Sequence, residues 1–209
     1  MGDVRTSNCC VVFSKPATAG RVKTRLIGAL TADEAAELHQ AFLDDLITRL
    51  IGREFDLEIA WALADDEAMP EGDVPGFRQQ GEDLGERLYH GLRHVGRRYE
   101  HVAALGSDHP EIPVSVIDQA FDRLDGHDAV VGPAADGGYY LIAFDADRLR
   151  PELFADIAWS TERVLAQTLE HCATAGLEVS LLPEGRDVDS PDDLRRLRRF
   201  LSREVHDCE

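Results

Sequence analysis

Short apolar runs alternate with helix-patterned segments along nearly the whole chain of 209 residues. The first run, Cys9–Phe13, is continuous, which is typical of a strand covered on both faces. A helix is expected next, because Thr31 and Glu34 form a capping-box pattern and apolar residues keep helical spacing to about Ile51. Strands that alternate with helices predict an α/β fold, with a mostly parallel sheet and helices on both faces.

The same alternation continues toward the C-terminus. Further strands are expected at 56–63, 102–105, 128–131, 138–144 and 177–182, and helices at 84–95, 113–124, 151–157, 161–175 and 191–203. Residues 65–73 are acidic and contain Pro70, so they are expected to form a solvated loop. The length suits one large domain and no linker-like stretch interrupts it, so residues 1–209 are expected to form a single domain.

The charge balance excludes several classes of partner. The chain has forty Asp and Glu against twenty-two Lys and Arg, for a net charge of -18. Nucleic acids and anionic membranes attract positive surfaces, so neither is an expected partner. No run of about twenty apolar residues occurs, so no membrane span is expected. The acidity leaves open whether the host has a high-salt cytoplasm.

The four cysteines are expected to be reduced thiols, because no C-x-x-C pair or histidine spacing suggests a zinc site. They are Cys9, Cys10, Cys172 and Cys208. Cys9 and Cys10 begin an apolar run, where cysteine acts as a small hydrophobe, so both are expected in the core. No secretory signal pattern precedes that run, and the cytoplasm is the expected compartment.

The stretch 13–26, called the basic loop below, is purely cationic despite the acidic composition. Residues 4–32 contain no Asp or Glu, and they hold the chain's only lysines, Lys15 and Lys23, together with Arg21 and Arg25. Arg21, Lys23 and Arg25 alternate along the chain, so in an extended loop their side chains would point to one side. Arg forks onto phosphate oxygens and Lys supplies a point charge, so this loop is expected to bind a triphosphate or pyrophosphate. The alternative is that these cations balance the protein's own surface acids. The spacing does not match a P-loop.

Carboxylates follow two of the expected strands. Asp108 comes after 102–105, and Asp187 and Asp189 come after 177–182. Ligands bind outside the carboxyl ends of strands in open α/β sheets, so these residues should share one edge with the basic loop. Mg²⁺ usually takes one or two carboxylates plus substrate phosphates, which makes the cluster a candidate metal site. The alternative for Asp189 is capping of the terminal helix, a role that Ser190 could also fill.

Three more motifs fall in expected loops at that edge. The glycines of Asp136-Gly137-Gly138 would let the backbone approach a ligand, or would simply form a hairpin turn. The amides of Gln79 and Gln80, with Gly81 and Gly85 nearby, could read a nucleobase edge, or Gly81 could simply precede a helix. Trp159-Ser160-Thr161 suits a helix cap that follows a core aromatic residue. Because it is expected near the same edge of the sheet, it stays a candidate for the functional site.

Together these motifs resemble the GT-A, or nucleotide-diphospho-sugar transferase, superfamily, and most of all its branch known as domain of unknown function 2064. The resembling stretches keep their order along the chain: 13–26, 80–88, 106–110, 132–141, 159–161 and 187–191. The first stretch and the helix after it also resemble the guanylyltransferase that acts on 2-phospho-lactate.

The resemblance implies a Rossmann-like three-layer sandwich of the GT-A type, with a mixed but mostly parallel sheet. It implies phosphate binding by Lys15, Arg21, Lys23 and Arg25, a nucleobase near Gln80, Gly81 and Gly85, Mg²⁺ or Mn²⁺ at Asp108 with Asp189 as its second carboxylate, and Asp136 facing the acceptor. Gly137, Gly138, Trp159, Ser160 and Asp187 remain candidates for acceptor binding or catalysis.

The implied activity is metal-dependent nucleotidyl or glycosyl transfer, with a nucleoside triphosphate or a nucleotide sugar as donor and a sugar or other small molecule as acceptor. Four cations on the first loop suit a triphosphate better than a diphosphate sugar. Glycosyl transfer from a nucleotide sugar stays open, as does a nucleotide-binding regulatory module without turnover. The sequence also leaves open whether the chain forms a homodimer.

Overall fold

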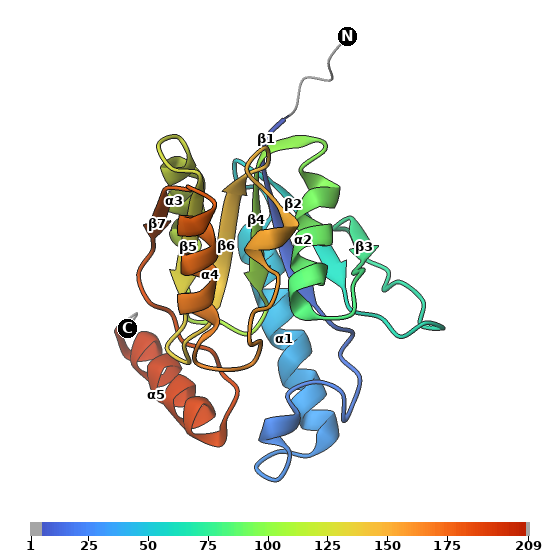
Figure 1. Cartoon of the computed structure of the whole chain (residues 1–209). Coiled ribbons are helices and arrows are strands. Elements are labelled where there is room, and N and C mark those ends of the chain that lie inside the picture. Colours follow the sequence, from blue (N-terminus) through green and yellow to red (C-terminus); the bar gives the residue numbers. More distant parts are fainter. Residues whose placement is uncertain (1–5, 208–209) are drawn as a thin grey trace.

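A seven-stranded sheet forms the centre of the computed structural model, which describes residues 6–207 (Figure 1). The strand order is β3-β2-β1-β4-β6-β5-β7. All neighbouring strands pair in parallel except at β6, which is antiparallel to both β4 and β5. The strands are β1 (Thr6–Ser14), β2 (Asp56–Trp61), β3 (Gly76–Arg78), β4 (Tyr99–Gly106), β5 (Ala129–Pro133), β6 (Tyr139–Asp145) and β7 (Val179–Leu181). The predicted mixed, mostly parallel sheet is confirmed.

Helices cover both faces of the sheet and complete the three predicted layers. The helices are α1 (Ala32–Leu50), α2 (Leu84–Val95), α3 (Ser115–Leu124), α4 (Val164–Thr174) and α5 (Pro191–Asp207), with single 3-10 turns η1 (Thr24–Leu26) and η2 (Pro151–Leu153). One hydrophobic cluster joins the sheet to α1 and α3, and the other joins it to α2 and α4. A small third cluster packs Leu197 of α5 onto Phe42 of α1.

The first strand shows why the sequence pattern identified the sheet. Cys10 and Val12 point into the α1–α3 cluster, whereas Cys9 and Val11 point into the α2–α4 cluster. All four are fully buried, so the strand needs apolar residues on both faces. Burial raises the pKa of the Cys10 thiol to about 12. The core role of both cysteines is confirmed; Cys9, Cys10 and Cys172 are free thiols, and Cys208 lies outside the described residues.

The structure differs from the sequence-based expectations in two places. The helix expected at 151–157 is only the turn η2, since the chain leaves helical geometry and Asp156 adopts a left-handed φ of 55°. Leu153 and Phe154 are nevertheless buried, so their apolar spacing reflects packing of an irregular segment. The edge strand β3 was not predicted, because three residues are too few to show a pattern.

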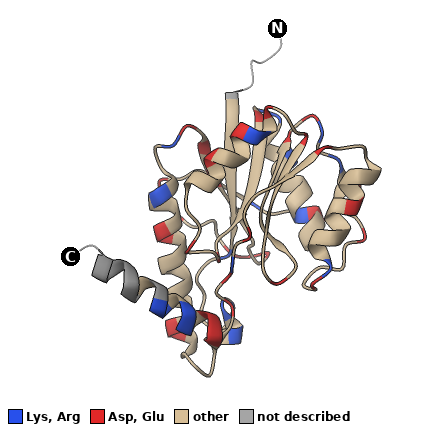
Figure 2. Ribbon diagram, turned by 90° about the vertical axis from the view of Figure 1, so that its left-hand side faces the viewer, with Lys and Arg blue, Asp and Glu red and all other residues tan. Residues whose placement is uncertain are grey.

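The sheet places the loops of interest at one edge. Strands β1, β2, β4, β5 and β7 run in the same direction, so the segments that follow them meet at the lower edge in Figure 1. Charged residues lie mainly on the helices and loops, while the strands are largely uncharged (Figure 2). Within residues 6–207 no helix has the length and apolar character needed to cross a bilayer.

Candidate functional site

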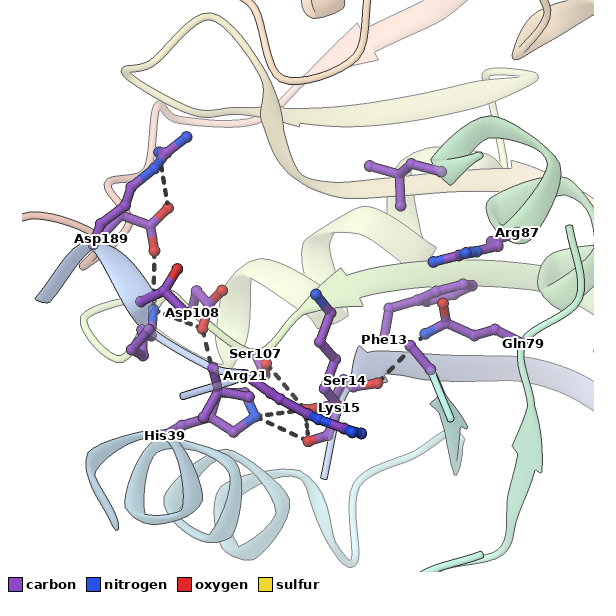
Figure 3. A pocket seen from close by; sticks show the side chains of 16 residues that line it. Phe13, Ser14, Lys15, Arg21, His39, Gln79, Arg87, Ser107, Asp108 and Asp189 are labelled. Carbon is purple, nitrogen blue, oxygen red and sulfur yellow. Dashed lines mark hydrogen bonds and ion pairs between the residues drawn. The ribbon is translucent and has the colours of Figure 1, made fainter. Parts of the chain in front are cut away.

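An open cavity of about 420 Å³ lies at the lower edge of the sheet (Figure 3). The loop after β1, the end of β4, the segment before α5 and the start of α2 all contribute to its wall. Six residues predicted from the sequence line it, namely Lys15, Arg21, Lys23, Arg25, Asp108 and Asp189. The structure therefore brings the basic loop and the two predicted metal ligands together.

The basic loop is not extended, so the prediction that its three alternating cations point to one side is wrong. Lys23 has a left-handed backbone, with φ 47° and ψ 35°, and the turn η1 follows it directly. Val22 and Leu26 are buried, and placing both in the core curls the chain between them. The side chains of Arg21 and Arg25 are 63% and 74% exposed, whereas that of Lys23 is 2% exposed.

The ammonium of Lys23 lies between the two predicted metal ligands. Its Nζ is 2.7 Å from Asp108 Oδ1 and 3.2 Å from Asp189 Oδ1. It also donates a hydrogen bond of 2.7 Å to the carbonyl oxygen of Val188. The ammonium thus donates hydrogen bonds to Val188 and Asp189 and forms an ion pair with Asp108. One lysine thereby ties the loop after β1 to the end of β4 and to the segment that leads into α5.

Both carboxylates are held by more than one positive or polar group. Burial alone would raise the pKa of the Asp108 carboxyl, but the His39 ring and the Lys23 ammonium outweigh it and hold that pKa well below its usual range. The Nδ1 atom of His39 is 3.8 Å from Asp108 Oδ1. The second oxygen of Asp189 is 3.6 Å from a terminal nitrogen of Arg25. Asp189 therefore lies between two cations.

Helix capping does not account for Asp189. Ser190 caps α5, since its Oγ accepts a hydrogen bond of 3.2 Å from the backbone N–H of Asp193. The Asp193 carboxylate in turn accepts from the backbone N–H of Ser190 at 2.9 Å, which completes a capping box. Asp189 is left to face Lys23 and Arg25.

The donor set suits a single hard cation. One ammonium contacts an oxygen of Asp108 and an oxygen of Asp189, so these two oxygens converge on a common point. Carboxylate oxygens are the ligands that Mg²⁺ and Mn²⁺ prefer, with substrate phosphates and water completing the shell. No group of three or more His, Cys, Asp or Glu within residues 6–207 is arranged for a metal. The chain would therefore supply two carboxylates to a metal. In this structure the Lys23 ammonium lies at the point on which their oxygens converge.

One buried polar residue of the cavity wall, His39, was not predicted from the sequence. His39, on α1, is buried, and its Nε2 lies 3.0 Å from the carbonyl oxygen of Lys15 and 3.3 Å from Ser14 Oγ. Ser14 Oγ donates to Ser107 Oγ at 3.3 Å. The available signal was a histidine on the apolar face of a predicted helix, spaced four residues after Ala35.

Arg87 is a second residue that the motif analysis did not assign. It lines the cavity from α2, and its Nε donates a 3.0 Å hydrogen bond to the carbonyl oxygen of Gly81. Figure 3 shows Lys15 projecting between Asp108 on one side and Arg87 and Gln79 on the other. Among the described residues neither Lys15 nor Arg87 forms an ion pair, and Arg21 only approaches Glu67 at 3.9 Å. These three cations face open space.

A neighbouring cavity of about 480 Å³ shares that cationic wall. Lys15, Arg21, Gln79 and Arg87 line both cavities, and the second extends toward Thr18, Glu67, Arg78 and Gly81. The amide nitrogen of Gln79 donates to the carbonyl oxygen of Ala60 at 2.8 Å, which fixes its orientation. Of the predicted base-binding residues, Gly81 lines this space and Gln80 is exposed outside both cavities.

Gly85 lies in a packing contact. A Cβ added at Gly85 would lie 2.5 Å from the Phe154 carbonyl oxygen and 3.0 Å from the Trp159 ring. Gly85 and Trp159 thus meet in the interior and line neither cavity. The base-binding assignment of Gln80, Gly81 and Gly85 stays a prediction.

The remaining candidates surround the β5–β6 hairpin and do not line the two cavities. Asp136 accepts a 2.9 Å hydrogen bond from the backbone N–H of Gly138, and Gly137 has a positive φ of 88°. A Cβ on Gly137 would lie 2.3 Å from the carbonyl oxygen of Glu162, so this glycine permits close backbone packing. Ser160 is exposed, in a turn with φ 63°.

The ionisation of Asp187 depends on charges in both this hairpin and the main cavity. Burial raises the pKa of its carboxyl to about 6, with further contributions from the negative charges of Asp189 and Asp136. The ionisation of Asp187 is therefore coupled to the charge of a cavity residue, Asp189, and to that of a hairpin residue, Asp136. Acceptor or catalytic roles for Asp136, Gly137, Gly138, Trp159, Ser160 and Asp187 stay predictions.

A known protein family matches the central part of the chain. Residues 47–161 match the family model described as "Uncharacterized protein conserved in bacteria (DUF2064)". The match spans more than half of the chain and includes Asp108 and Arg87. No protein with a curated description matches the sequence.

Solved structures share the fold over nearly the full length. A candidate nucleotide-diphospho-sugar transferase from Desulfovibrio desulfuricans G20 is 36% identical, with a TM-score of 0.88 over 93% of this chain and 88% of that chain. CMP:2-keto-3-deoxy-manno-octonic acid synthetase complexed with CTP is 12% identical, with a TM-score of 0.58 over 95% and 100%. Rv0371c from Mycobacterium tuberculosis H37Rv, complexed with manganese, is 21% identical, with a TM-score of 0.53 over 93% and 98%. The last two show likeness of fold alone. The predicted GT-A type sandwich and the resemblance to this superfamily are confirmed.

Proposed function

The chain belongs to the DUF2064 family, and from that premise we propose that it is a metal-dependent nucleotidyltransferase. One observation carries the proposal: Lys15, Arg21 and Arg87 face an open cavity whose opposite wall holds the carboxylates of Asp108 and Asp189. The neighbour complexed with CTP has the same fold and adds support.

Lys15, Arg21 and Arg87 suit the phosphates of a nucleoside triphosphate. Lys23 and Arg25 are already paired with carboxylates, so Lys15, Arg21 and Arg87 carry the positive charge that a ligand meets first. Two of the three are arginines, which can each bind two phosphate oxygens. The second cavity, on the other side of these cations, has room for the nucleoside.

The reaction requires an acceptor oxygen to form a bond with the α-phosphorus while the bond to the bridging oxygen of pyrophosphate breaks. The leaving pyrophosphate takes the electron pair, and Lys15, Arg21 and Arg87 would stabilise its growing negative charge. A divalent cation, when bound, would act as a Lewis acid and offset negative charge on the phosphates. Asp108 and Asp189 would hold that cation, with His39 keeping Asp108 in place.

Glycosyl transfer from a nucleotide sugar is the second candidate. The Desulfovibrio desulfuricans structure, described as a candidate nucleotide-diphospho-sugar transferase, favours it. A diphosphate would also bind the three cations, and the sugar would then lie toward Asp136 and Asp187. The two reactions differ in their products, because nucleotidyl transfer releases pyrophosphate and glycosyl transfer releases a nucleoside diphosphate.

The experiment is a thermal-shift panel of nucleoside triphosphates and nucleotide sugars, each with and without Mg²⁺ or Mn²⁺. Ligands that bind only the folded state raise its melting temperature, so the panel identifies the base and the phosphate chain. The best ligands are then incubated with the protein and candidate sugar or small-molecule acceptors, and both products are measured. A ligand that binds but yields neither product would favour a regulatory module. A cytoplasmic location remains a prediction, and whether the chain forms a homodimer stays open.

A further inference from the structure

The ammonium of Lys23 takes the place where a divalent cation would bind Asp108 and Asp189. It lies 2.7 Å and 3.2 Å from one oxygen of each carboxylate, and its side chain is 2% exposed. The ammonium also donates a hydrogen bond of 2.7 Å to the carbonyl oxygen of Val188. Lys23 therefore cannot contact a phosphate, and a metal cannot bind both of these oxygens, without breaking these interactions.

The backbone at Lys23 also shows that this arrangement is imposed by its surroundings. Lys23 is a non-glycine residue with a φ of 47°, a conformation that costs free energy and persists only where neighbouring contacts require it. The adjacent Val22 and Leu26 anchor the loop in the core, and the three polar contacts fix the side chain between them. The lysine is thus held at this point from both its backbone and its side chain.

We propose that Lys23 is an internal counter-cation that competes with a divalent metal for Asp108 and Asp189, so that the metal binds strongly only together with a polyphosphate. The proposal deepens the proposed function, since it rests on the polyphosphate being the ligand of the adjacent cationic wall. It differs from the sequence-based assignment, in which Lys23 is simply a phosphate ligand.

Lys23 and a metal compete for the two carboxylates, and the polyphosphate is linked to that competition. A tethered ammonium is present at a high effective concentration, so a metal ion alone must displace it from both carboxylates. A polyphosphate changes the balance in two ways, because its oxygens offer the displaced ammonium new partners and give the metal additional ligands. By linkage, the metal must strengthen polyphosphate binding by the same factor as the polyphosphate strengthens metal binding.

A purely structural lysine would behave differently. If Lys23 only joins the loop to the end of β4, removing its charge would destabilise the fold and leave the metal affinity unchanged or lower. If Lys23 competes with the metal, removing its charge exposes two uncompensated carboxylates that already converge. The affinity for the metal alone should then increase, although the fold becomes less stable.

The test measures Mn²⁺ binding without nucleotide, by electron paramagnetic resonance of the free ion, for the wild type and for Lys23→Met. Methionine keeps most of the side-chain length and removes the charge. We expect Mn²⁺ to bind Lys23→Met at least about tenfold more tightly than the wild type, and the gain to be lost in Lys23→Met with Asp189→Asn. Equal or weaker Mn²⁺ binding by Lys23→Met would overturn the proposal.

A second measurement tests the coupling. Melting temperatures are recorded with Mn²⁺ alone, with inorganic tripolyphosphate alone and with both, at the same concentrations for each variant. We expect the combined shift to exceed the sum of the single shifts in the wild type and in Lys23→Arg. The excess should be smaller in Lys23→Met, where the polyphosphate still gives the metal ligands but no longer receives a displaced ammonium. A combined excess of the same size in Lys23→Met and the wild type would contradict the proposal. If Lys23→Met does not fold, Lys23→Gln replaces it, since glutamine retains N–H donors without charge.

These outcomes are separable from those that test the proposed function. Mn²⁺ binding without nucleotide does not depend on turnover, so the competition can be present in a protein that transfers nothing. Conversely, release of pyrophosphate together with unchanged Mn²⁺ binding by Lys23→Met would leave the proposed function intact and remove only the role given to Lys23.

Discussion

The Nε2 atom of His39 lies 3.0 Å from the carbonyl oxygen of Lys15, so a buried histidine of α1 holds the turn from which a cavity lysine projects. The other ring nitrogen faces Asp108 at 3.8 Å. One side chain therefore spans the distance between the cationic wall and the carboxylate wall. It makes the two walls parts of one site.

Replacing His39 should loosen both walls. His39→Ala leaves the Lys15 carbonyl oxygen without this donor, at a cost of about 1–3 kcal/mol in the free energy of unfolding. We also expect weaker nucleotide binding, measured by calorimetry. His39→Gln places an N–H donor close to the position of Nε2 and should recover most of the stability. Equal stability of the alanine variant and the wild type would show that the hydrogen bond contributes nothing.

Arg87 should contribute directly to phosphate binding. Removing one of the three cations of this wall should weaken nucleotide binding about tenfold, or about 1.4 kcal/mol. Arg93 provides a matched control, because it is exposed on the same helix and does not line the cavity. Calorimetric titration of Arg87→Ala and Arg93→Ala should show the loss only in the former. A similar affinity for both variants would show that the phosphates bind elsewhere.

Gly85 should matter for the fold and not for the ligand. In Gly85→Ala the new Cβ would lie 2.5 Å from the Phe154 carbonyl oxygen, so the segment must shift at a cost of about 1–3 kcal/mol. Gly126→Ala is the control, since nothing lies within 4 Å of its Cβ position. Chemical denaturation should separate the two variants. A folded Gly85→Ala with intact stability and lost nucleotide affinity would instead support the predicted base-binding role.

The Asp187 carboxyl makes stability depend on pH. Its pKa is raised to about 6 in the folded state, so ionisation of Asp187 destabilises the fold as the pH rises from about 4 to about 6. Asn cannot ionise, so Asp187→Asn should be more stable than the wild type at pH 7.5. Because Asp187 is about half-buried, we expect only about 1 kcal/mol.

The same gain should disappear at the acidic end of this range. Denaturation at about pH 4 and pH 7.5, with EDTA to remove trace metal, measures the difference between Asp187→Asn and the wild type. A gain that is equal at both pH values would assign it to a cause other than ionisation.

The layers and the edge of the sheet could be predicted because they depend on local sequence pattern. Cys9–Val12 is apolar on both faces and Thr31 with Glu34 forms the expected capping box, so strand and helix were evident. Parallel strands then require that Lys15, Asp108 and Asp189 lie at one edge. Their meeting in one cavity follows from topology.

Side-chain roles within that cavity could not be predicted, because they depend on contacts between distant segments. Lys23 and Arg25 lie two residues apart in the same loop, yet one is buried between carboxylates and the other is exposed. The difference follows from burial of Val22 and Leu26, which curls the loop. His39 was missed because its partners come from the ends of β1 and β4.

The most direct test of the account is calorimetric titration of the wild type and of Lys15→Ala with Arg87→Ala, using nucleoside triphosphates with Mg²⁺. We predict that at least one triphosphate binds the wild type with one site per chain, and that the double variant binds it at least about tenfold more weakly. Failure of every triphosphate to bind the wild type, or equal affinity for a correctly folded double variant, would contradict the claim that this cavity is a polyphosphate site.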